Sequence, residues 1–415
     1  MPLTSCRICG MTAFETVLDL GDQYLTGVFP KAEDTQMLSK GPLRLVRCCE
    51  PDGCGLVQLD NSFDPNEMYG ANYGYRSGLN PSMVRHLKSR VNKIIQRSSL
   101  SESDVVIDVG SNDGTTLNFY PSHLTRVGID PTAQKFRGFY PPDCRVAADF
   151  FSADLAMSIT KGRSAKVITA FSMMYDLEQP VDFVRQIKQV LDADGIFVFE
   201  QSYLPLMLER VAFDTICHEH LEYYAMRQID WMLHEAGLEA IDVELNEVNG
   251  GSFAVTAAHP SRFTPSESVV ELRLSEERLW SDPRAPLAEF RQQSFNAIRE
   301  LQEFVKAQRL AEKRIAGLGA STKGNVLLQA AKLGPEYISV IGDVNPDKEG
   351  RVTPGTWIPI VSEADALAGN FDYYLVLPWH FKEFFLQSPT FRDRRLVFPL
   401  PVLQHGTQPH HNRTD

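Results

Sequence analysis

The 415-residue sequence lacks the features that mark several large classes of protein. No apolar run approaches the roughly 18 to 20 residues that span a bilayer, so no membrane association is expected. Asp and Glu (53) outnumber Lys and Arg (41), and the formal charge of −12 argues against a nucleic-acid partner, because phosphate binding needs clustered cations. The first residues lack the basic and then apolar character of a signal peptide, so we expect a cytoplasmic location.

Internal repeats and low-complexity segments are also missing, and the composition is that of ordinary globular domains. Hydrophobic residues make up 43% of the sequence and charged residues 23%. A chain of this length exceeds one compact core, so two or three domains are expected. The motifs described below divide it into residues 1–70, 71–264 and 265–415.

Cysteine is scarce outside the N-terminal region, since five of the seven cysteines lie within the first 54 residues. Cys6 and Cys9 form a Cys-x-x-Cys pair on a turn, and Cys48, Cys49 and Cys54 form a second group. Two such groups can converge on one tetrahedral, structural zinc ion. The spacing leaves open whether Cys48 or Cys49 is the ligand; we favour Cys49, together with Cys6, Cys9 and Cys54. Buried free thiols that only pack are the alternative.

Strand-like and helix-like segments alternate after this region, which predicts an α/β fold with a doubly wound, Rossmann-like domain. A second, smaller Rossmann-like domain is expected near the C-terminal end, and one long bridging helix over residues 265–314 joins the two. The tail from His405 is expected to be disordered. The central domain is expected to contain a helix at 81–96 and strands at 105–109, 126–130, 166–170, 195–200, 238–244 and 251–257.

A turn of small residues directly after the first central strand predicts a cofactor site. Asp130, at the end of the next strand, can accept hydrogen bonds from both ribose hydroxyls. The Gly-x-Gly-x-x-Gly spacing of dinucleotide-binding enzymes is absent at Gly110, which favours S-adenosylmethionine over NAD. The predicted cofactor ligands are Asp108, Gly110, Ser111, Asn112, Asp113, Gly114, Asp130 and Pro131, with Asp149 and Phe150 beside the adenine and Phe171 and Met173 beside the sulfonium.

The segment Cys217-His218-Glu219-His220 concentrates two imidazoles and a carboxylate, a density that is unusual outside a functional site. An imidazole titrates near neutral pH and a neighbouring carboxylate can orient it, so general base chemistry is the favoured interpretation. A metal centre and histidines that only pack are the alternatives.

The third region contains Gly-Ala-Ser321-Thr322-Lys323-Gly-Asn325 where a short strand passes into a helix. Backbone amides, hydroxyls and an ammonium at a helix N-terminus suit a pyrophosphate. We therefore predict that Ser321, Thr322, Lys323 and Asn325 bind the nucleotide of the substrate. A solvated surface position is the alternative for Lys323.

Taken in order, these motifs resemble the sugar-nucleotide C-methyltransferase family. The resemblance rests on the Cys-x-x-Cys pair, a Tyr-rich connector, Asp-Val-Gly-Ser-Asn-Asp-Gly, Ile-Cys-His-Glu-His and Gly-Ala-Ser-Thr-Lys-Gly-Asn, and it covers essentially the whole chain. It implies a zinc-binding N-terminal domain, a central methyltransferase domain, and a C-terminal Rossmann-like domain that grips the nucleotide sugar, with Asp343, Asn345, Thr353 and Trp379 as further candidates. The implied reaction methylates a carbon next to the keto group of a nucleotide-linked 4-keto-6-deoxysugar.

The resemblance assigns the general base to His220, with Glu219 and His218 beside it. The sequence departs from the family at Cys217, where tyrosine is usual. A hydrogen bond to the enolate oxygen is then expected from tyrosines, of which Tyr73 and Tyr75 are catalytic candidates and Tyr223 and Tyr224 are substrate-binding candidates.

Alternative functions remain open at this stage. One is an O- or N-methyltransferase that acts on a sugar nucleotide or another natural product. Outside that class stand an NAD(P)-dependent oxidoreductase and a non-catalytic nucleotide-sugar-binding protein. In each case we expect a small-molecule partner and a monomer or homodimer.

Overall fold

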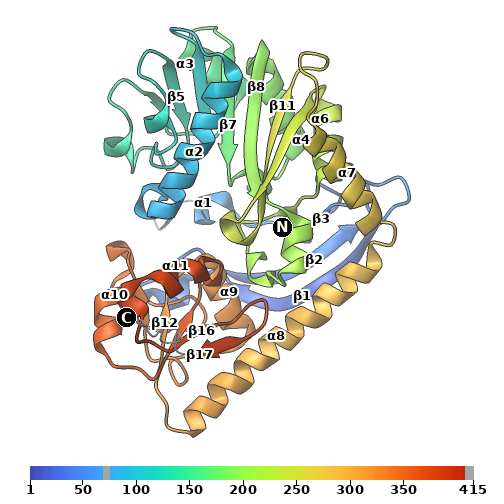
Figure 1. Cartoon of the computed structure of the whole chain (residues 1–415). Coiled ribbons are helices and arrows are strands. Elements are labelled where there is room, and N and C mark those ends of the chain that lie inside the picture. Colours follow the sequence, from blue (N-terminus) through green and yellow to red (C-terminus); the bar gives the residue numbers. More distant parts are fainter. Residues whose placement is uncertain (69–74, 407–415) are drawn as a thin grey trace, which may run out of the picture.

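The computed structural model describes residues 1–68 and 75–406, which form three β-sheets with their associated helices (Figure 1). The seven-stranded sheet lies at the top of Figure 1 and the six-stranded sheet at the lower left. The strands of the N-terminal sheet run between these two parts. The N-terminal region is therefore in a position to contact both larger domains.

The N-terminal sheet is antiparallel, and its fourth strand comes from a distant part of the chain. Its order is β1-β2-β3-β9, and β9 pairs with β3 through Val57 opposite Tyr223. This pairing places the residues two and three positions after His220 in the sheet of the N-terminal region. The strands are β1 (Phe14–Tyr24), β2 (Lys40–Cys48), β3 (Val57–Leu59) and β9 (Glu222–Tyr223).

The central sheet has the order β10-β11-β8-β7-β4-β5-β6. Its strands β4 to β8 are parallel, whereas β11 and β10 are antiparallel at one edge. The predicted doubly wound α/β domain is confirmed. The strands are β4 (Val105–Val109), β5 (Thr125–Ile129), β6 (Arg145–Ala147), β7 (Ala165–Phe171), β8 (Leu191–Ser202), β10 (Glu239–Asn246) and β11 (Ser252–Ala258).

Helices cover both faces of this sheet, which explains why β4 is buried along its whole length. Val91 and Ile94 of α2 pack with Val106 and Val198 on one face. Apolar side chains of α4 and α6 pack in a separate cluster with Val105. The helices of this domain are α2 (Pro81–Ser98), α3 (Ala153–Thr160), α4 (Pro180–Val190), α5 (Leu204–Glu209) and α6 (Met226–Ala236).

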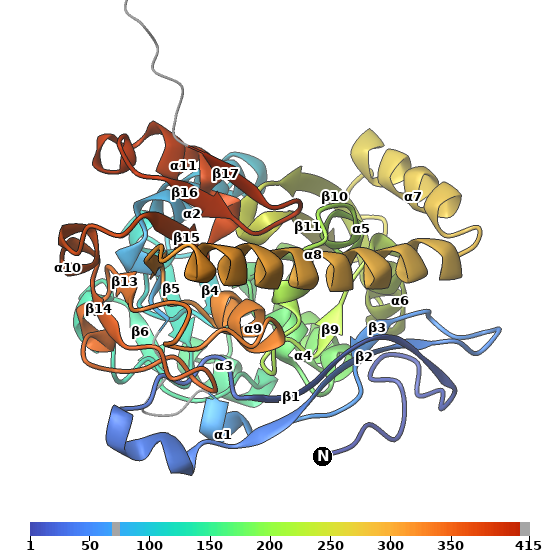
Figure 2. The ribbon, with the colours of Figure 1, turned by 90° about the horizontal axis from the view of Figure 1, so that it is seen from below.

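The prediction of a single bridging helix is wrong, because two helices occupy that region. They are α7 (Glu267–Leu279) and α8 (Arg284–Leu310). Pro283 lies between them, and proline lacks the amide hydrogen that a continuing helix needs. Helix α8 buries Phe290 and Leu301, and Figure 2, the view from below, shows it running across the molecule in the foreground.

The C-terminal sheet has the order β14-β13-β12-β15-β16-β17, parallel except for β17. The prediction that the tail is disordered from His405 is wrong for His405, which pairs with Val397. The elements are β12 (Ile315–Leu318), α9 (Thr322–Ala330), β13 (Ile341–Asp343), β14 (Ile360–Ser362), α10 (Glu363–Ala368), β15 (Tyr373–Val376), α11 (Lys382–Gln387), β16 (Leu396–Phe398) and β17 (Gln404–Gly406).

One apolar cluster joins all three parts of the molecule. It contains Leu45 of β2, Phe213 from the central domain, Phe290 of α8 and Val326 of α9. The short helix α1 (Pro65–Met68) packs in a small separate cluster through Met68. Among the helices of residues 1–68 and 75–406, none has the length and apolar character needed to cross a membrane.

Candidate active site

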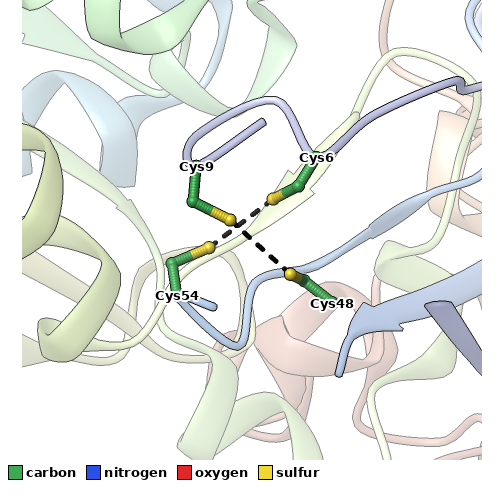
Figure 3. A group of neighbouring side chains, drawn as sticks. All are labelled: Cys6, Cys9, Cys48 and Cys54. Atoms are coloured by element: carbon green, nitrogen blue, oxygen red, sulfur yellow. Dashed lines mark hydrogen bonds between the residues drawn. The ribbon is translucent and has the colours of Figure 1, made fainter. Parts of the chain in front are cut away.

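Four cysteine side chains converge in the N-terminal region. The Sγ atoms of Cys6, Cys9, Cys48 and Cys54 all lie within 4.8 Å of one another (Figure 3). The Cys6–Cys54 and Cys9–Cys48 sulfur pairs are 3.5 and 3.6 Å apart. Sulfurs bound tetrahedrally to zinc at 2.3 Å are separated by about 3.8 Å, so this arrangement fits one zinc ion with four thiolates.

The sequence-based preference for Cys49 is wrong, because the structure brings Cys48 into the cluster. Cys48 is the last residue of β2 and its side chain is buried, whereas the side chain of Cys49 is only half-buried and is not part of the group. Successive residues of a strand point to opposite faces, so only one of two adjacent cysteines can face the site.

Proton sharing within the cluster shows how closely the thiols interact. The pKa of Cys6 is lowered to about 5, chiefly by its hydrogen bond with Cys54, and the pKa of Cys54 is raised by the same bond. Burial is the main cause that raises the pKa of Cys48 to about 12. Without a cation the site favours one thiolate, and a zinc ion would supply the charge that stabilises four.

A cavity of about 390 Å³ lies at the carboxyl ends of the parallel strands of the central sheet. This is the usual position of ligand sites in open α/β sheets, and the volume suits a small molecule. Tyr75 and Phe150 are about half exposed beside it. The cavity lining includes the predicted cofactor residues Asp108, Gly110, Ser111, Asn112, Asp130, Pro131, Asp149, Phe150, Phe171 and Met173.

The backbone around this cavity is held by the acids that follow the strands. Asp130 accepts a hydrogen bond from the Asn112 amide at 2.8 Å and another from the Thr132 amide at 2.6 Å. Burial raises the pKa of Asp108 to about 7, against the opposing hydrogen bond from Thr169. A Cβ at Gly110 would lie 2.9 Å from the side chain of Met173, so glycine permits the loop after β7 to approach the turn after β4.

Asp113 and Gly114 were predicted as cofactor ligands, but they do not line the cavity. Asp113 accepts hydrogen bonds from Arg76 and from the Gly78 amide, at 3.1 and 3.0 Å. It therefore anchors the segment that carries Tyr75, which does line the cavity. Gly114 packs against the ring of Tyr140. The other predicted tyrosine, Tyr73, lies outside the described residues.

The two histidines of the Cys-His-Glu-His segment point in different directions. His218 is fully buried and packs edge-on against Phe63, with ring centroids 4.6 Å apart. His220 is only half-buried and contacts Tyr175 at a centroid distance of 4.2 Å. The metal alternative is therefore wrong for this segment: within the described residues, the cysteine cluster is the group suited to a metal.

His220 has the geometry of a neutral base. Its Nδ1 lies 2.9 Å from the backbone carbonyl of Thr215, which can only accept a hydrogen bond, so Nδ1 carries the hydrogen and Nε2 is the free acceptor. Burial and the nearby Lys323 ammonium lower its pKa to about 3. Its neighbour Tyr175 belongs to η5 (Met174–Asp176), directly after Met173 of the cavity wall. His220 thus lies next to the loop that borders the cofactor cavity.

Glu219 is buried between the N-terminal and C-terminal regions. A Cβ at Gly27 would lie 1.9 Å from Glu219 Oε1 and 3.6 Å from the Thr322 hydroxyl, so only glycine fits between them. Burial raises the pKa of Glu219, while hydrogen bonds from Cys217, Thr26 and the Gly27 backbone oppose that shift. Glu219 therefore fixes the segment next to His220 and does not reach the cavity.

Tyr223 and Tyr224 were predicted to face the substrate, but both side chains are buried in the protein. The Tyr223 hydroxyl donates to the Thr215 carbonyl at 3.3 Å, the same carbonyl that His220 contacts. Tyr224 belongs to the cluster that includes Cys6 and Cys54. Of the described tyrosine candidates, Tyr75 alone lines the cavity.

The Ser-Thr-Lys-Gly-Asn segment forms several hydrogen bonds within the protein, and its role in binding the nucleotide stays a prediction. Ser321 caps α9 by accepting a hydrogen bond from the Gly324 amide. Asn325 is fully buried, and its amide donates to the Thr26 carbonyl at 2.7 Å. Lys323 donates to the Asn249 carbonyl at 2.5 Å. These bonds join the C-terminal domain to the other two regions.

Sequence reasoning did not single out Asp214, Asn249 or His380, which lie near Lys323, although the family resemblance made Trp379 a candidate. Trp379 donates to Asp214 at 2.7 Å, and burial raises the pKa of Asp214 to about 6. Burial lowers the pKa of His380, which follows Trp379. Asn249 donates to the hydroxyl of Ser172 in the cavity wall at 3.3 Å. These residues are far apart in the sequence, so only their buried polar character could have drawn attention to them.

Comparisons with known proteins agree with this arrangement. Three family models match in succession: a zinc binding domain at residues 6–69, a methyltransferase domain at 83–243, and a C-methyltransferase C-terminal domain at 247–401. The chain is similar to the C-methyltransferase NovU of Streptomyces niveus, with 28% identity over 409 residues and 96% of each chain covered.

Solved structures with similarity to this chain include two methyltransferases. An S-adenosylmethionine-dependent methyltransferase from Clostridium acetobutylicum has 13% identity and a TM-score of 0.34, covering 42% of this chain and 92% of its own. The CcbJ methyltransferase from Streptomyces caelestis has 13% identity and a TM-score of 0.33, covering 42% of this chain and 89% of its own. On the three family models and the full-length relative, the chain is an S-adenosylmethionine-dependent C-methyltransferase with an N-terminal zinc-binding domain.

Proposed function

We propose that the protein methylates a carbon next to the keto group of a nucleotide-linked 4-keto-6-deoxysugar, with His220 as the general base. The observation that carries the proposal is the hydrogen bond from His220 Nδ1 to the Thr215 carbonyl. It leaves Nε2 as a proton acceptor beside the loop that borders the cofactor cavity. A free imidazole nitrogen at this place suits removal of a proton from a carbon that faces the methyl donor.

The chemistry requires an acidified C–H bond, which a neighbouring carbonyl provides. His220 Nε2 takes the proton, the C–H electron pair forms the enolate, and the enolate carbon bonds to the methyl group while the sulfur keeps the electrons of the broken S–CH₃ bond. Bound S-adenosylmethionine would supply that methyl group. Glu219 and the Thr215 carbonyl hold the histidine segment in place throughout.

Sequence similarity supports carbon as the acceptor atom, since the relative covering 96% of the chain is named a C-methyltransferase. The sugar nucleotide fits the location of the base between the cofactor cavity and the C-terminal domain, where a two-part ligand can contact both. Half-buried side chains of Lys323 and His220 leave part of this region accessible.

The test is a panel of nucleotide-linked 4-keto-6-deoxysugars incubated with the protein and S-adenosylmethionine in heavy water, followed by mass spectrometry. We expect one sugar to gain a methyl group on carbon and to lose its α-hydrogen. Methylation of a hydroxyl or an amine, without α-hydrogen loss, would replace the proposal with O- or N-methylation.

Two matched variants connect the reaction to His220. His220→Gln removes the base and is expected to lower the methylation rate by about 10²- to 10⁴-fold, the usual contribution of general base catalysis. His234→Gln changes an exposed histidine on α6 and serves as the control. Equal turnover by the two variants would exclude His220 from proton transfer.

A further inference from the structure

The first turn of α9 brings Lys323 into the region of the catalytic segment. Thr322 lies across Gly27 from Glu219, since the Thr322 hydroxyl and the Glu219 carboxylate both lie within 4 Å of the same point. Residues 322 and 219 are therefore spatial neighbours, and each directly precedes Lys323 or His220 in the chain. The C-terminal domain thus contributes its lysine to the site that contains the base.

The Lys323 ammonium has hydrogen-bonding capacity that the protein does not use. Its bond to the Asn249 carbonyl occupies one of three N–H donors. Within residues 1–68 and 75–406, no carboxylate forms an ion pair with it. Asp214 is the nearby acid, and its Oδ2 accepts the Trp379 indole hydrogen. An ammonium with two remaining donors is suited to bind an oxygen that develops negative charge.

Neighbouring groups make Lys323 the cation of this region. Burial and the Lys323 charge both lower the pKa of His220 and of His380, so the two imidazoles are neutral. Burial lowers the pKa of Lys323, and the nearby Asp214 carboxyl, whose own pKa is raised to about 6 by burial, opposes that shift.

Contacts of Asn249 place the ammonium on the cofactor side of the site. Asn249 accepts from Lys323 through its carbonyl and donates through its side chain to Ser172, which lines the cofactor cavity. The sugar ring separates the pyrophosphate of the substrate from the reacting carbon. The keto oxygen, in contrast, is bonded to the carbon directly next to the reacting carbon. Lys323 is linked to the cofactor wall through Asn249 and lowers the pKa of His220, so its position suits a contact with the keto oxygen.

We propose that Lys323 is a catalytic residue that donates a hydrogen bond to the enolate oxygen. When His220 removes the α proton, the C–H electron pair moves into the new C=C bond and the carbonyl oxygen becomes negative. A free N–H of Lys323 stabilises that oxygen without transferring its own proton. Attack of the enolate carbon on the methyl group restores the neutral ketone. This inference rests on the proposed function, because it requires an enolate.

The experiment compares Lys323→Met with Lys382→Met in the full-length protein, using the keto sugar that the wild-type protein methylates. Lys382 belongs to the same domain, but its ammonium contacts Gln404 and not the residues around Lys323 and His220. We expect kcat for methylation and the rate of α-hydrogen exchange in heavy water to fall by about 10²- to 10³-fold in Lys323→Met. The KM for the sugar nucleotide and the affinity for S-adenosylmethionine should change little, and Lys382→Met should behave as wild type.

Lys323→Ala with added ethylammonium adds a measurement that a purely structural role would not affect. Rescue of turnover by the free amine, without a change in thermal stability, is the expected result. An increased KM with an unchanged kcat would show instead that Lys323 binds the phosphates, and unchanged kinetics would exclude any role. If the wild-type protein neither exchanges nor methylates any keto sugar, the proposed function itself fails and this inference with it.

Discussion

Exchanging one of two adjacent cysteines tests the metal site most directly. Cys48→Ser removes one of four thiols within 4.8 Å of each other, whereas Cys49→Ser changes a neighbour outside that group. Structural zinc sites contribute about 10–16 kcal/mol of binding free energy, so one thiolate of four accounts for roughly 2.5–4 kcal/mol if the ligands contribute equally. That corresponds to an affinity loss of about 10²- to 10³-fold, since 1.4 kcal/mol is tenfold.

Zinc affinity can be measured by competition with a chromophoric chelator, and zinc content by elemental analysis. Wild type and Cys49→Ser should retain about one zinc per chain at a chelator concentration that strips Cys48→Ser. Thermal unfolding should show the same order, because zinc that binds only the folded state stabilises it. Zinc loss in Cys49→Ser with retention in Cys48→Ser would refute the assignment of the ligands.

Asp130→Ala should weaken S-adenosylmethionine binding by about 1.5–3 kcal/mol in calorimetry, because a charged hydrogen-bond acceptor is lost from the cavity wall, and unchanged affinity would contradict its ribose role. Gly27→Ala should lower the methylation rate by about 10²-fold by displacing Glu219, while Gly138→Ala, where a Cβ meets nothing within 4 Å, should not; equal rates would refute the contact. Burial lowers the pKa of His218 from 6.5 to about 4, so on acidification the unfolded state takes up a proton before the folded state does, and the free energy of unfolding falls as the pH drops from 6.5 to 4. His218→Gln should remove up to about 3 kcal/mol of that fall in acid denaturation curves. An unchanged curve would exclude this titration.

Local patterns predicted the central domain well, because each element is marked by neighbouring residues. The run Val105–Val109 is apolar and directly precedes a turn of small residues, and both features are local. The acid Asp130 could be recognised from its place at the end of a strand. Pro283 could have shown that the bridging helix is interrupted, but the helical composition on both sides obscured it.

Side-chain direction and long-range contact were not predictable in the same way. Cys48 and Cys49 are the same residue type, so the sequence does not distinguish them. The direction of the side chains at the end of strand β2 determines that Cys48 faces the metal site. Asn325 resembles a ligand in the sequence, yet it bonds to Thr26, almost 300 positions away in the chain. Tyr224 is buried in the apolar cluster that includes Cys6 and Cys54, although its neighbours in sequence suggested a substrate-binding position.

The pairing of β3 with β9 has a consequence for how the chain assembles. Val57 pairs with Tyr223, so the N-terminal sheet lacks its last strand until the ribosome has completed most of the central domain. Until then β3 presents an unpaired edge, which is a known starting point for misassociation between chains. A truncated protein that ends before residue 222 should therefore aggregate even when zinc is present, and isolating the N-terminal domain would require a substitute for that short strand.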